Sequence, residues 1–427
     1  ENRTCSITLY FQPRLNPCYE SSNDLRKRTM PIDQKLIASE FPGAEGQVYL
    51  DCAARGLTPR RARTAVDAVL DAGMDGTGDK EEMFASIERV RSGFARMIHA
   101  DADDIAITKN VSEGLNAVIA SLDLTAGDNV VLCTDLEHPN NVYPWLHLRE
   151  RLGVEVRNIP SGGDAMPVEQ MIAAIDDRTR CVTVASVSFS PGFQTDMASL
   201  GAACRKHGAF YLVDGVQSVG IVETNIDDLN IDGLAVSTQK GLLGLYGMGL
   251  VYCRRQWADR MTPVYLARFG VDLGSGVHEA ALGSDNYELM PGARRFDLGN
   301  YNYVGAAAAA ESIDLLNELQ VPEIESHVRT LTHRLADGLL ELDLPVAGGA
   351  AGDHLTSLVC VGHEGSGHDS TEDEDMGSLS RHFSENGVKH SIRRGRIRLS
   401  FHVYNTADDV AAVLSLAKSW RGGWAAA

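Results

Sequence analysis

Short apolar runs alternate with amphipathic stretches along most of the chain. Apolar residues recur every three or four positions at residues 59–69, 80–98 and 197–207, which predicts helices. The apolar runs that lie outside these stretches are predicted as strands at residues 104–108, 129–133, 154–159, 180–186, 208–213 and 233–236. Because strand and helix alternate, we expect an α/β fold whose mainly parallel sheet is covered by helices on both faces.

The length and composition are typical of a globular protein with two domains. The chain has 427 residues, of which 44% are hydrophobic and 23% are charged. We expect residues 31–300 to form a large domain with the parallel sheet, and residues 301–427 to form a smaller C-terminal α+β domain. Residues 1–30 show neither helical nor strand periodicity, so we expect them to be disordered and exclude them from the fold.

The charge and the cysteines narrow the class of protein. A net charge of −19 disfavours nucleic acids and anionic membranes as partners, and no apolar run is long enough to span a membrane. The eight cysteines include no C-x-x-C pair, so we expect free thiols in the cytoplasm and no metal site. The acidic run 362–375 contains His363 and His368, and we interpret it as a surface loop rather than a metal site.

The most specific chemical pattern follows the predicted strands 208–213 and 233–236. The polar residues after these strands are Asp214, Gln217, Ser237, Gln239 and Lys240. In parallel sheets ligands gather at the carboxyl ends of strands, so we expect these side chains to share one site. Together they offer a carboxylate, amides, a hydroxyl and an amine, the groups that pyridoxal 5'-phosphate (PLP) requires.

PLP gives each of these groups a role. Lys240 is expected to bind the cofactor aldehyde covalently, and Asp214 to keep the ring nitrogen protonated so that the ring can withdraw electrons from a carbanion. Gln217 is expected at the ring hydroxyl and Ser237 at the phosphate. Taken alone, Lys240 could be an ordinary surface lysine after a strand, but the Asp-Gly-Val-Gln run upstream favours the cofactor.

These motifs resemble the class V aminotransferase group of fold-type I enzymes, which includes cysteine desulfurases, isopenicillin N epimerases and kynureninases. The family signature is Asp-x-x-Gln followed by Ser-x-His-Lys and a glycine-rich tail. Here Gln239 occupies the position of the histidine, and an amide can donate a hydrogen bond to phosphate but carries no charge. The resemblance runs from about Tyr49 to Val410, and it implies the fold of a fold-type I PLP-dependent transferase.

The resemblance extends to further cofactor contacts. Residues 110–116 open a helix whose backbone amides, with Ser112 and Glu113, are expected to hold the phosphate, although Ser112 could instead be the N-cap. The resemblance places His138 over the cofactor ring. It also places Asn300 where cysteine desulfurases have a threonine that reaches the phosphate of the other subunit's cofactor, which implies a homodimer with shared active sites. The alternative for Asn300 is a helix N-cap.

Two arginines are the candidates for substrate binding. Arg398 alternates with apolar neighbours in a strand and matches the family's Arg-x-Ser-x-x-x-Tyr-Asn-Thr pattern, in which the arginine binds the substrate carboxylate as a bidentate fork. Arg55 follows a small-residue turn that lines the site entrance in the family, and a solvated arginine is the alternative. Many family members also carry an asparagine near the ring hydroxyl, which this chain lacks; Ser188 or Gln194 could replace it.

The predicted chemistry starts with removal of the α-proton of an amino acid by Lys240. Elimination, transamination and racemisation all branch from the resulting carbanion. Cysteine desulfurases need a nucleophilic cysteine on a loop shortly before the carboxylate-binding arginine, and no cysteine lies between Gly362 and Arg398. We therefore favour a β-eliminating carbon–sulfur lyase that acts on a cysteine-derived amino acid without a catalytic cysteine. The alternative is an aminotransferase or an isopenicillin N epimerase-like enzyme of secondary metabolism.

Overall fold

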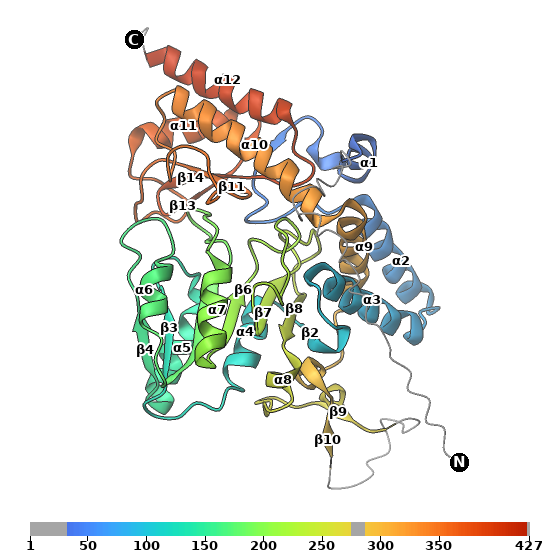
Figure 1. Cartoon of the computed structure of the whole chain (residues 1–427). Helices are drawn as coiled ribbons and strands as arrows, with labels where there is room; N and C mark the ends of the chain where they lie inside the picture. Colours follow the sequence, from blue (N-terminus) through green and yellow to red (C-terminus); the bar gives the residue numbers. More distant parts are fainter. Residues whose placement is uncertain (1–31, 275–286, 425–427) are drawn as a thin grey trace, which may run out of the picture. The chain divides into compact units, whose positions relative to one another are not determined.

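A seven-stranded sheet organises the described part of the chain, which comprises residues 32–274 and 287–424 of a computed structural model (Figure 1). Its strands run in the order β2 (Ile105–Thr108), β8 (Gly249–Cys253), β7 (Gly233–Ser237), β6 (Phe210–Asp214), β5 (Thr179–Ala185), β3 (Asn129–Leu132) and β4 (Glu155–Asn158). Strand β8 is antiparallel to both of its neighbours, and the other pairs are parallel. The expected mainly parallel sheet is confirmed.

Both faces of this sheet are covered, which explains why its strands are continuously apolar. Along β6, Phe210 and Leu212 enter one buried cluster, whereas Tyr211 and Val213 enter another, because successive strand residues point to opposite faces. The first cluster includes α4 (Val111–Ile119) and α5 (Tyr143–Leu152). The second includes α3 (Lys80–Ile98), α6 (Val168–Ala173), α7 (Met197–His207) and α9 (Tyr303–Leu319).

The C-terminal part contains a second, antiparallel sheet. Its strands are β11 (Leu358–Val361), β14 (Arg396–Ser400) and β13 (Ser391–Arg393), in that order. The helices of this part, drawn in orange and red in Figure 1, are α10 (Val321–Glu341), α11 (Glu374–Glu385) and α12 (Ala407–Trp424). The strand expected around Arg398 is present as β14, and a domain boundary near residue 300 stays a prediction.

A segment near residue 50 joins the C-terminal part to the large sheet. Strand β1 (Val48–Tyr49) pairs in parallel with β12 (Val388–Lys389), and Asn405 Nδ2 donates to the Tyr49 carbonyl at 2.9 Å. The remaining helices and strands are α1 (Gln34–Glu40), α2 (Arg60–Asp75), α8 (Arg255–Ala258), β9 (Val271–Asp272) and β10 (Glu288–Leu289). Residues 1–30, for which disorder was predicted, lie outside the described residues.

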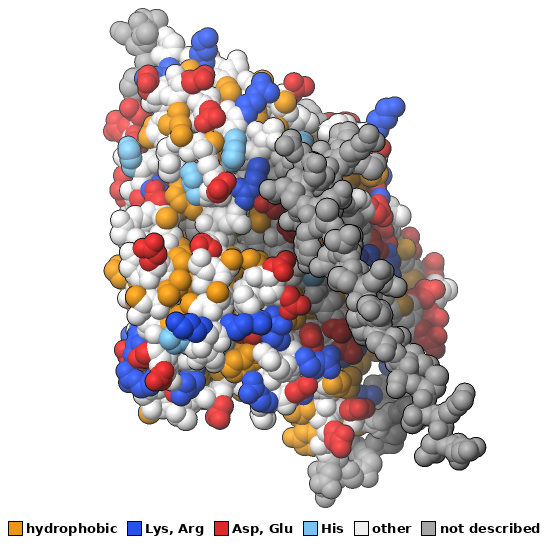
Figure 2. Space-filling model, in the orientation of Figure 1, with side chains coloured by type: hydrophobic (Ala, Val, Ile, Leu, Met, Phe, Trp, Pro, Cys, Tyr) orange, Lys and Arg blue, Asp and Glu red, His pale blue; other side chains and the backbone are white. Residues whose placement is uncertain are grey.

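The helices and one face of the surface can be compared with what the composition predicts, within the described residues. None of the helices there is long and apolar enough to cross a bilayer. Figure 2 shows acidic and basic side chains together on one face, so the net charge of −19 does not make that face uniformly acidic. Six cysteines in the described ranges are buried and unpaired. The cytoplasmic location stays a prediction.

Candidate active site

Asp214 lies at the carboxyl end of β6, in register with Ala235 of β7, the strand that leads to Lys240. Its side chain is only 6% exposed, and Oδ1 accepts a hydrogen bond from the Val216 amide at 3.0 Å. Burial raises the pKa of Asp214, while the Val216 amide and the charge of Lys240 oppose that rise. A buried carboxylate therefore faces a cation at the strand ends, as expected from the sequence.

Lys240 follows β7 by three residues and is largely removed from solvent. Its pKa is lowered to about 8, chiefly by burial and next by the neighbouring charge of Arg398, whereas Asp214 acts in the opposite direction. Lys240 forms no ion pair with any described residue. A larger fraction of this amine is neutral near pH 7 than for an ordinary lysine, as a nucleophile or base requires.

The turn after β1 closes the site next to this lysine. Gln217 Nε2 donates to the Ala53 carbonyl at 3.2 Å, and the Ala53 amide donates to Ser400 Oγ at 2.9 Å. The Gly56 amide donates to the Gln239 carbonyl at 2.9 Å, and a side chain at Gly56 would clash with the Lys240 carbonyl. Gln217 and Gln239 thus lie at the site with Lys240. Arg55, next to Gly56, has an exposed side chain, and its role stays a prediction.

The N-terminus of α4 meets the end of β7 at the predicted phosphate site. The Val111 amide donates to Ser237 Oγ at 2.8 Å, so the helix start and the serine lie in contact. The N-cap of α4 is Asn110, whose Oδ1 accepts from the Glu113 amide at 2.9 Å, and the alternative role of Ser112 as the cap is wrong. The Glu113 carboxylate turns back to accept from the amide of Lys109, the residue before this N-cap. Its predicted role at the cofactor stays a prediction.

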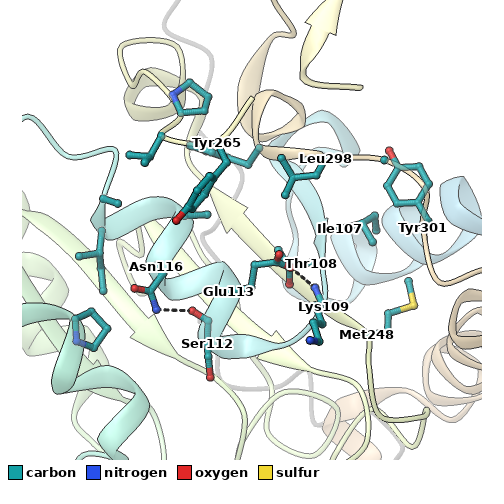
Figure 3. A pocket seen from close by; sticks show the side chains of 18 of the residues that line it. Ile107, Thr108, Lys109, Ser112, Glu113, Asn116, Met248, Tyr265, Leu298 and Tyr301 are labelled. Carbon is teal, nitrogen blue, oxygen red and sulfur yellow. Dashed lines mark hydrogen bonds between the residues drawn. The ribbon is translucent and has the colours of Figure 1, made fainter. Parts of the chain in front are cut away.

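Ser112 and Asn300 line one cavity of about 710 Å³ (Figure 3). The segment that carries Asn300 is anchored by Asp297, a 2%-exposed carboxylate that accepts from the Ile107 amide and from Arg91 Nη2, both at 2.8 Å. Asn300 has a φ of 44° and is not a helix cap. That position is taken by Asn302, whose Oδ1 accepts from the Gly305 amide at 2.9 Å, so the alternative role of Asn300 is wrong.

His138 presents a neutral imidazole to the site. Its Nδ1 accepts from the Asn140 amide at 3.2 Å, which assigns the ring proton to Nε2. Burial lowers the pKa of His138 to about 4, and the charge of Lys240 adds to this effect. The ring lies edge-on to Phe189, with the centroids 5.5 Å apart. The charge of Lys240 thus acts on His138, and its location over the cofactor ring stays a prediction.

Arg398 is a buried cation without an anionic partner in the described part of the chain. It is 2% exposed, and burial lowers its pKa to about 10. Its Nη1 donates to the Phe189 carbonyl at 2.9 Å and its Nε to Ser391 Oγ at 3.1 Å. A buried guanidinium that has no carboxylate of its own is costly unless an anion joins it, so this geometry favours an anion-binding site.

One acid in the site was missed by the sequence reasoning. Glu137 is 1% exposed, and its carboxyl accepts from the Ala185 amide at 2.6 Å and from Asn141 Nδ2 at 2.7 Å. Burial raises its pKa to about 8, and the nearby charge of Asp214 adds to the rise. Ala185 is also the register partner of Asp214. An acidic residue directly before His138, just after a strand, was the available signal.

Ser188 and Gln194, the possible replacements for the family's asparagine near the ring hydroxyl, already form hydrogen bonds within the chain. Ser188 is 2% exposed, and its Oγ accepts from the amides of Gly192 and Phe193 at 3.1 and 3.2 Å. Gln194 Oε1 accepts from Arg329. Both side chains hold the loop after β5 in place, and neither replacement is favoured by these contacts.

Comparison with known proteins identifies the family. Residues 48–413 match the family model described as aminotransferase class V. The chain belongs to the class V aminotransferase family. A probable cysteine desulfurase of Methanothermobacter thermautotrophicus is 29% identical over 388 residues, covering 88% of this chain and 94% of that protein. A probable cysteine desulfurase of Pyrococcus abyssi is 29% identical over 401 residues, covering 89% of this chain and 96% of that protein.

Solved structures support the same fold. The apo cysteine desulfurase of Thermococcus onnurineus NA1 superposes with a TM-score of 0.77 at 26% identity, covering 92% of this class V chain and 99% of that one. A complex of the cystine C–S lyase C-DES has a TM-score of 0.78 at 21% identity, covering 88% and 99%, and this likeness concerns the fold alone. The fold-type I architecture is confirmed, and the chain is a PLP-dependent enzyme.

The residues present fit PLP. Among the described residues, Lys240 offers an amine without an ion-pair partner, and the buried Asp214 carboxylate has only the Val216 amide as a hydrogen-bond donor. Ser237 and the start of α4 lie in contact beside them. This donor set matches the aldehyde, ring nitrogen and phosphate of PLP. The assignment of each residue to its cofactor atom stays a prediction.

Proposed function

We propose that this class V enzyme is a carbon–sulfur lyase, which removes the α-proton of a cysteine-derived amino acid and eliminates the sulfur group from its β carbon without a catalytic cysteine. The observation that carries the proposal is the segment between Gly362 and Arg398, which contains no cysteine. A desulfurase needs a nucleophilic thiol there, whereas elimination needs none. The cofactor and the carboxylate receptor serve both reactions.

The cysteines near the site support this choice. Cys360 and Cys52 are each 1% exposed, and burial raises the pKa of their thiols to about 11 and about 12. The thiolate is the nucleophilic form of cysteine, so both residues are poor nucleophiles at neutral pH. Cys360 also lies within β11 rather than on a loop.

The substrate carboxylate would bind Arg398. The buried guanidinium is held from two sides by the Phe189 carbonyl and Ser391 Oγ, which fixes its plane and directs its remaining N–H groups. A carboxylate supplies the negative charge that this cation lacks within the described part of the chain. Binding at Arg398 would hold the α carbon beside Lys240, whose pKa the Arg398 charge already affects.

Lys240 would act as the base at the α carbon. When bound, PLP withdraws electrons from this carbon, and Asp214, Gln217, Ser237, His138 and Lys240 are the residues that would hold it. Once the substrate amine has displaced Lys240, the lysine amine can take the α-proton, because its own chain keeps it within reach. Its pKa of about 8 places it close to the pH at which such a base works best.

We also propose that a second copy of the chain covers the cavity between Ser112 and Asn300. Three apolar residues that line this cavity are exposed: Val264 by 56%, Tyr265 by 72% and Leu298 by 40%. Exposed apolar groups gathered at one cavity favour a protein interface. Asn300 of one chain would then lie near the phosphate site of the other.

The function is tested by incubating the purified holoenzyme with L-cysteine, S-methyl-L-cysteine and S-benzyl-L-cysteine in deuterated water. A lyase releases pyruvate, ammonia and the thiol in equal amounts. Exchange of the α-proton without pyruvate would indicate an epimerase, and amino transfer to an added 2-oxo acid would indicate an aminotransferase. Either of these results would contradict the lyase proposal.

A further inference from the structure

The loop 362–373 is fastened to the turn between β13 and β14. The Gly365 amide donates to the Arg394 carbonyl at 2.8 Å, and the Gly395 amide donates to the Gly367 carbonyl at 3.0 Å. Arg393 Nη1 also donates to the His368 carbonyl at 3.3 Å. Backbone contacts from both sides of the turn therefore give the loop a defined position, only a few residues from Arg398.

This loop carries a histidine–aspartate pair. His368 Nδ1 lies 2.9 Å from Asp369 Oδ2, and Asp369 Oδ1 accepts from Arg393 Nη1 at 2.5 Å. The hydrogen bond with His368 lowers the pKa of Asp369, and Arg393 adds to this effect, so Asp369 is a carboxylate at neutral pH. A carboxylate on Nδ1 orients the imidazole and leaves Nε2 as the nitrogen that can deliver a proton.

His368 lies at the rim of a cavity of about 390 Å³, with its side chain 75% exposed. One side of the cavity is apolar and is lined by Pro139, Val142, Tyr143, Leu146 and Phe189, and the rest of its lining, which includes Glu137, Arg393 and Arg394, is polar. Phe189 connects this cavity to the site, because its ring contacts His138 and its carbonyl accepts from Arg398. The charge of His368 also contributes to the low pKa of His138. Phe189 thus lies between this cavity and the predicted carboxylate site at Arg398.

We propose that His368, oriented by Asp369, donates a proton to the departing sulfur, and that the apolar side of the cavity holds the substituent on that sulfur. The substrate class is then S-alkyl and S-aryl cysteine conjugates. This inference rests on the proposed lyase function and identifies its acid. Without an acid, an alkyl thiolate is a poor leaving group.

The proposed elimination conserves atoms and electrons. The α-proton passes to Lys240, the Cβ–S bond breaks with its electron pair on sulfur, and the Nε2 proton of the His368 imidazolium moves to that sulfur. The imidazole then regains a proton from solvent. With one water consumed, the conjugate yields one thiol, one pyruvate and one ammonia, and no oxidant or reductant is required.

The test is His368→Gln, assayed with leaving groups that differ in their need for a proton. With S-benzyl-L-cysteine we expect kcat to fall about 100-fold, the usual contribution of a general acid. With β-chloro-L-alanine, whose chloride leaves without a proton, we expect a change of less than about threefold. Exchange of the α-proton of S-benzyl-L-cysteine, followed by NMR, should continue in the variant, because Lys240 and Arg398 are intact.

His363→Gln is the matched control, since His363 lies on the same loop and outside the pair, and it should leave both substrates unaffected. If kcat of His368→Gln falls equally with both substrates, the variant has a general structural defect. If kcat falls with neither substrate, His368 and Asp369 form only a surface ion pair. Either result overturns the role of His368. If the wild-type enzyme forms pyruvate from β-chloro-L-alanine but not from the conjugates, the elimination chemistry stands and the cavity assignment fails. No pyruvate from any substrate would overturn the lyase function itself.

Discussion

Cys360 lies directly opposite Arg398 in the antiparallel pairing of β11 with β14. A thiol therefore adjoins the predicted carboxylate receptor, but it is 1% exposed and burial raises its pKa to about 11. The pairing fixes Cys360 in a strand of the small sheet. A sulfur-accepting cysteine would instead need to be a thiolate that can approach the β carbon.

Cys360→Ala should leave kcat for S-benzyl-L-cysteine within about threefold of the wild-type value, because the thiol takes no part in the chemistry. The free energy of unfolding should fall by about 1 kcal/mol through the loss of a buried sulfur. Steady-state kinetics and urea unfolding check the two expectations. A loss of kcat by several orders of magnitude, with the fold retained, would instead make Cys360 a nucleophile.

Arg398→Lys should raise the KM for the amino acid about 30-fold, since a point charge replaces a planar fork and costs about 2 kcal/mol. Affinity for PLP should change little. Arg396→Lys is the matched control: Arg396 lies on the same strand and is 6% exposed, but it has its own partner in Asp164 at 2.8 Å. If the two variants have the same KM, Arg398 does not bind the substrate.

Glu137 should make the free energy of unfolding depend on pH. Its pKa is about 8 in the folded chain and about 4.5 when unfolded, so the unfolded chain loses this proton first. The contribution to stability is complete below about pH 4.5 and is lost as the pH rises to about 8. Glu137→Gln removes this loss. Between pH 5 and pH 7.5, the unfolding free energy of the variant relative to the wild type should rise by roughly 3 kcal/mol. A pH-independent difference in urea unfolding would mean that Glu137 is ionised when folded.

The large sheet could be predicted because a strand that is buried on both faces has a continuous apolar sequence, as in Phe210–Asp214. Asp214 and Lys240 were predictable for a related reason, since residues that follow parallel strands share one edge of the sheet. The antiparallel direction of β8 could not be predicted, because a continuous apolar run does not show whether its strand pairs parallel or antiparallel with its neighbours.

Side-chain competition and long-range burial limited the prediction of the site. Asn300 and Asn302 are chemically identical candidates for the cap of α9, and only the backbone decides between them: φ is 44° at Asn300 and −73° at Asn302. Glu137 owes its burial to β5, and Asp369 owes its position to Arg393 on another strand. Such contacts arise from tertiary structure, and for Glu137 the only local signal was its place directly before His138.

The shared site is tested by mixing two inactive variants. If Asn300 reaches the partner's phosphate, Asn300→Ala should weaken retention of PLP, although Asn300 is remote in sequence from Lys240. In a heterodimer of Asn300→Ala with Lys240→Ala, one site carries both defects and the other carries neither, so activity should reappear. Activity and mass are measured before and after mixing. A monomeric mass with no recovered activity would rule out the shared site.

The most direct measurement of the central claim is the ratio of pyruvate to alanine formed from L-cysteine by the purified holoenzyme, with mass spectrometry of the protein during turnover. The lyase account predicts pyruvate, ammonia and sulfide in equal amounts, no alanine, and an unmodified chain. Formation of alanine together with a persulfide on a cysteine of the protein would contradict it and assign the enzyme to the desulfurases.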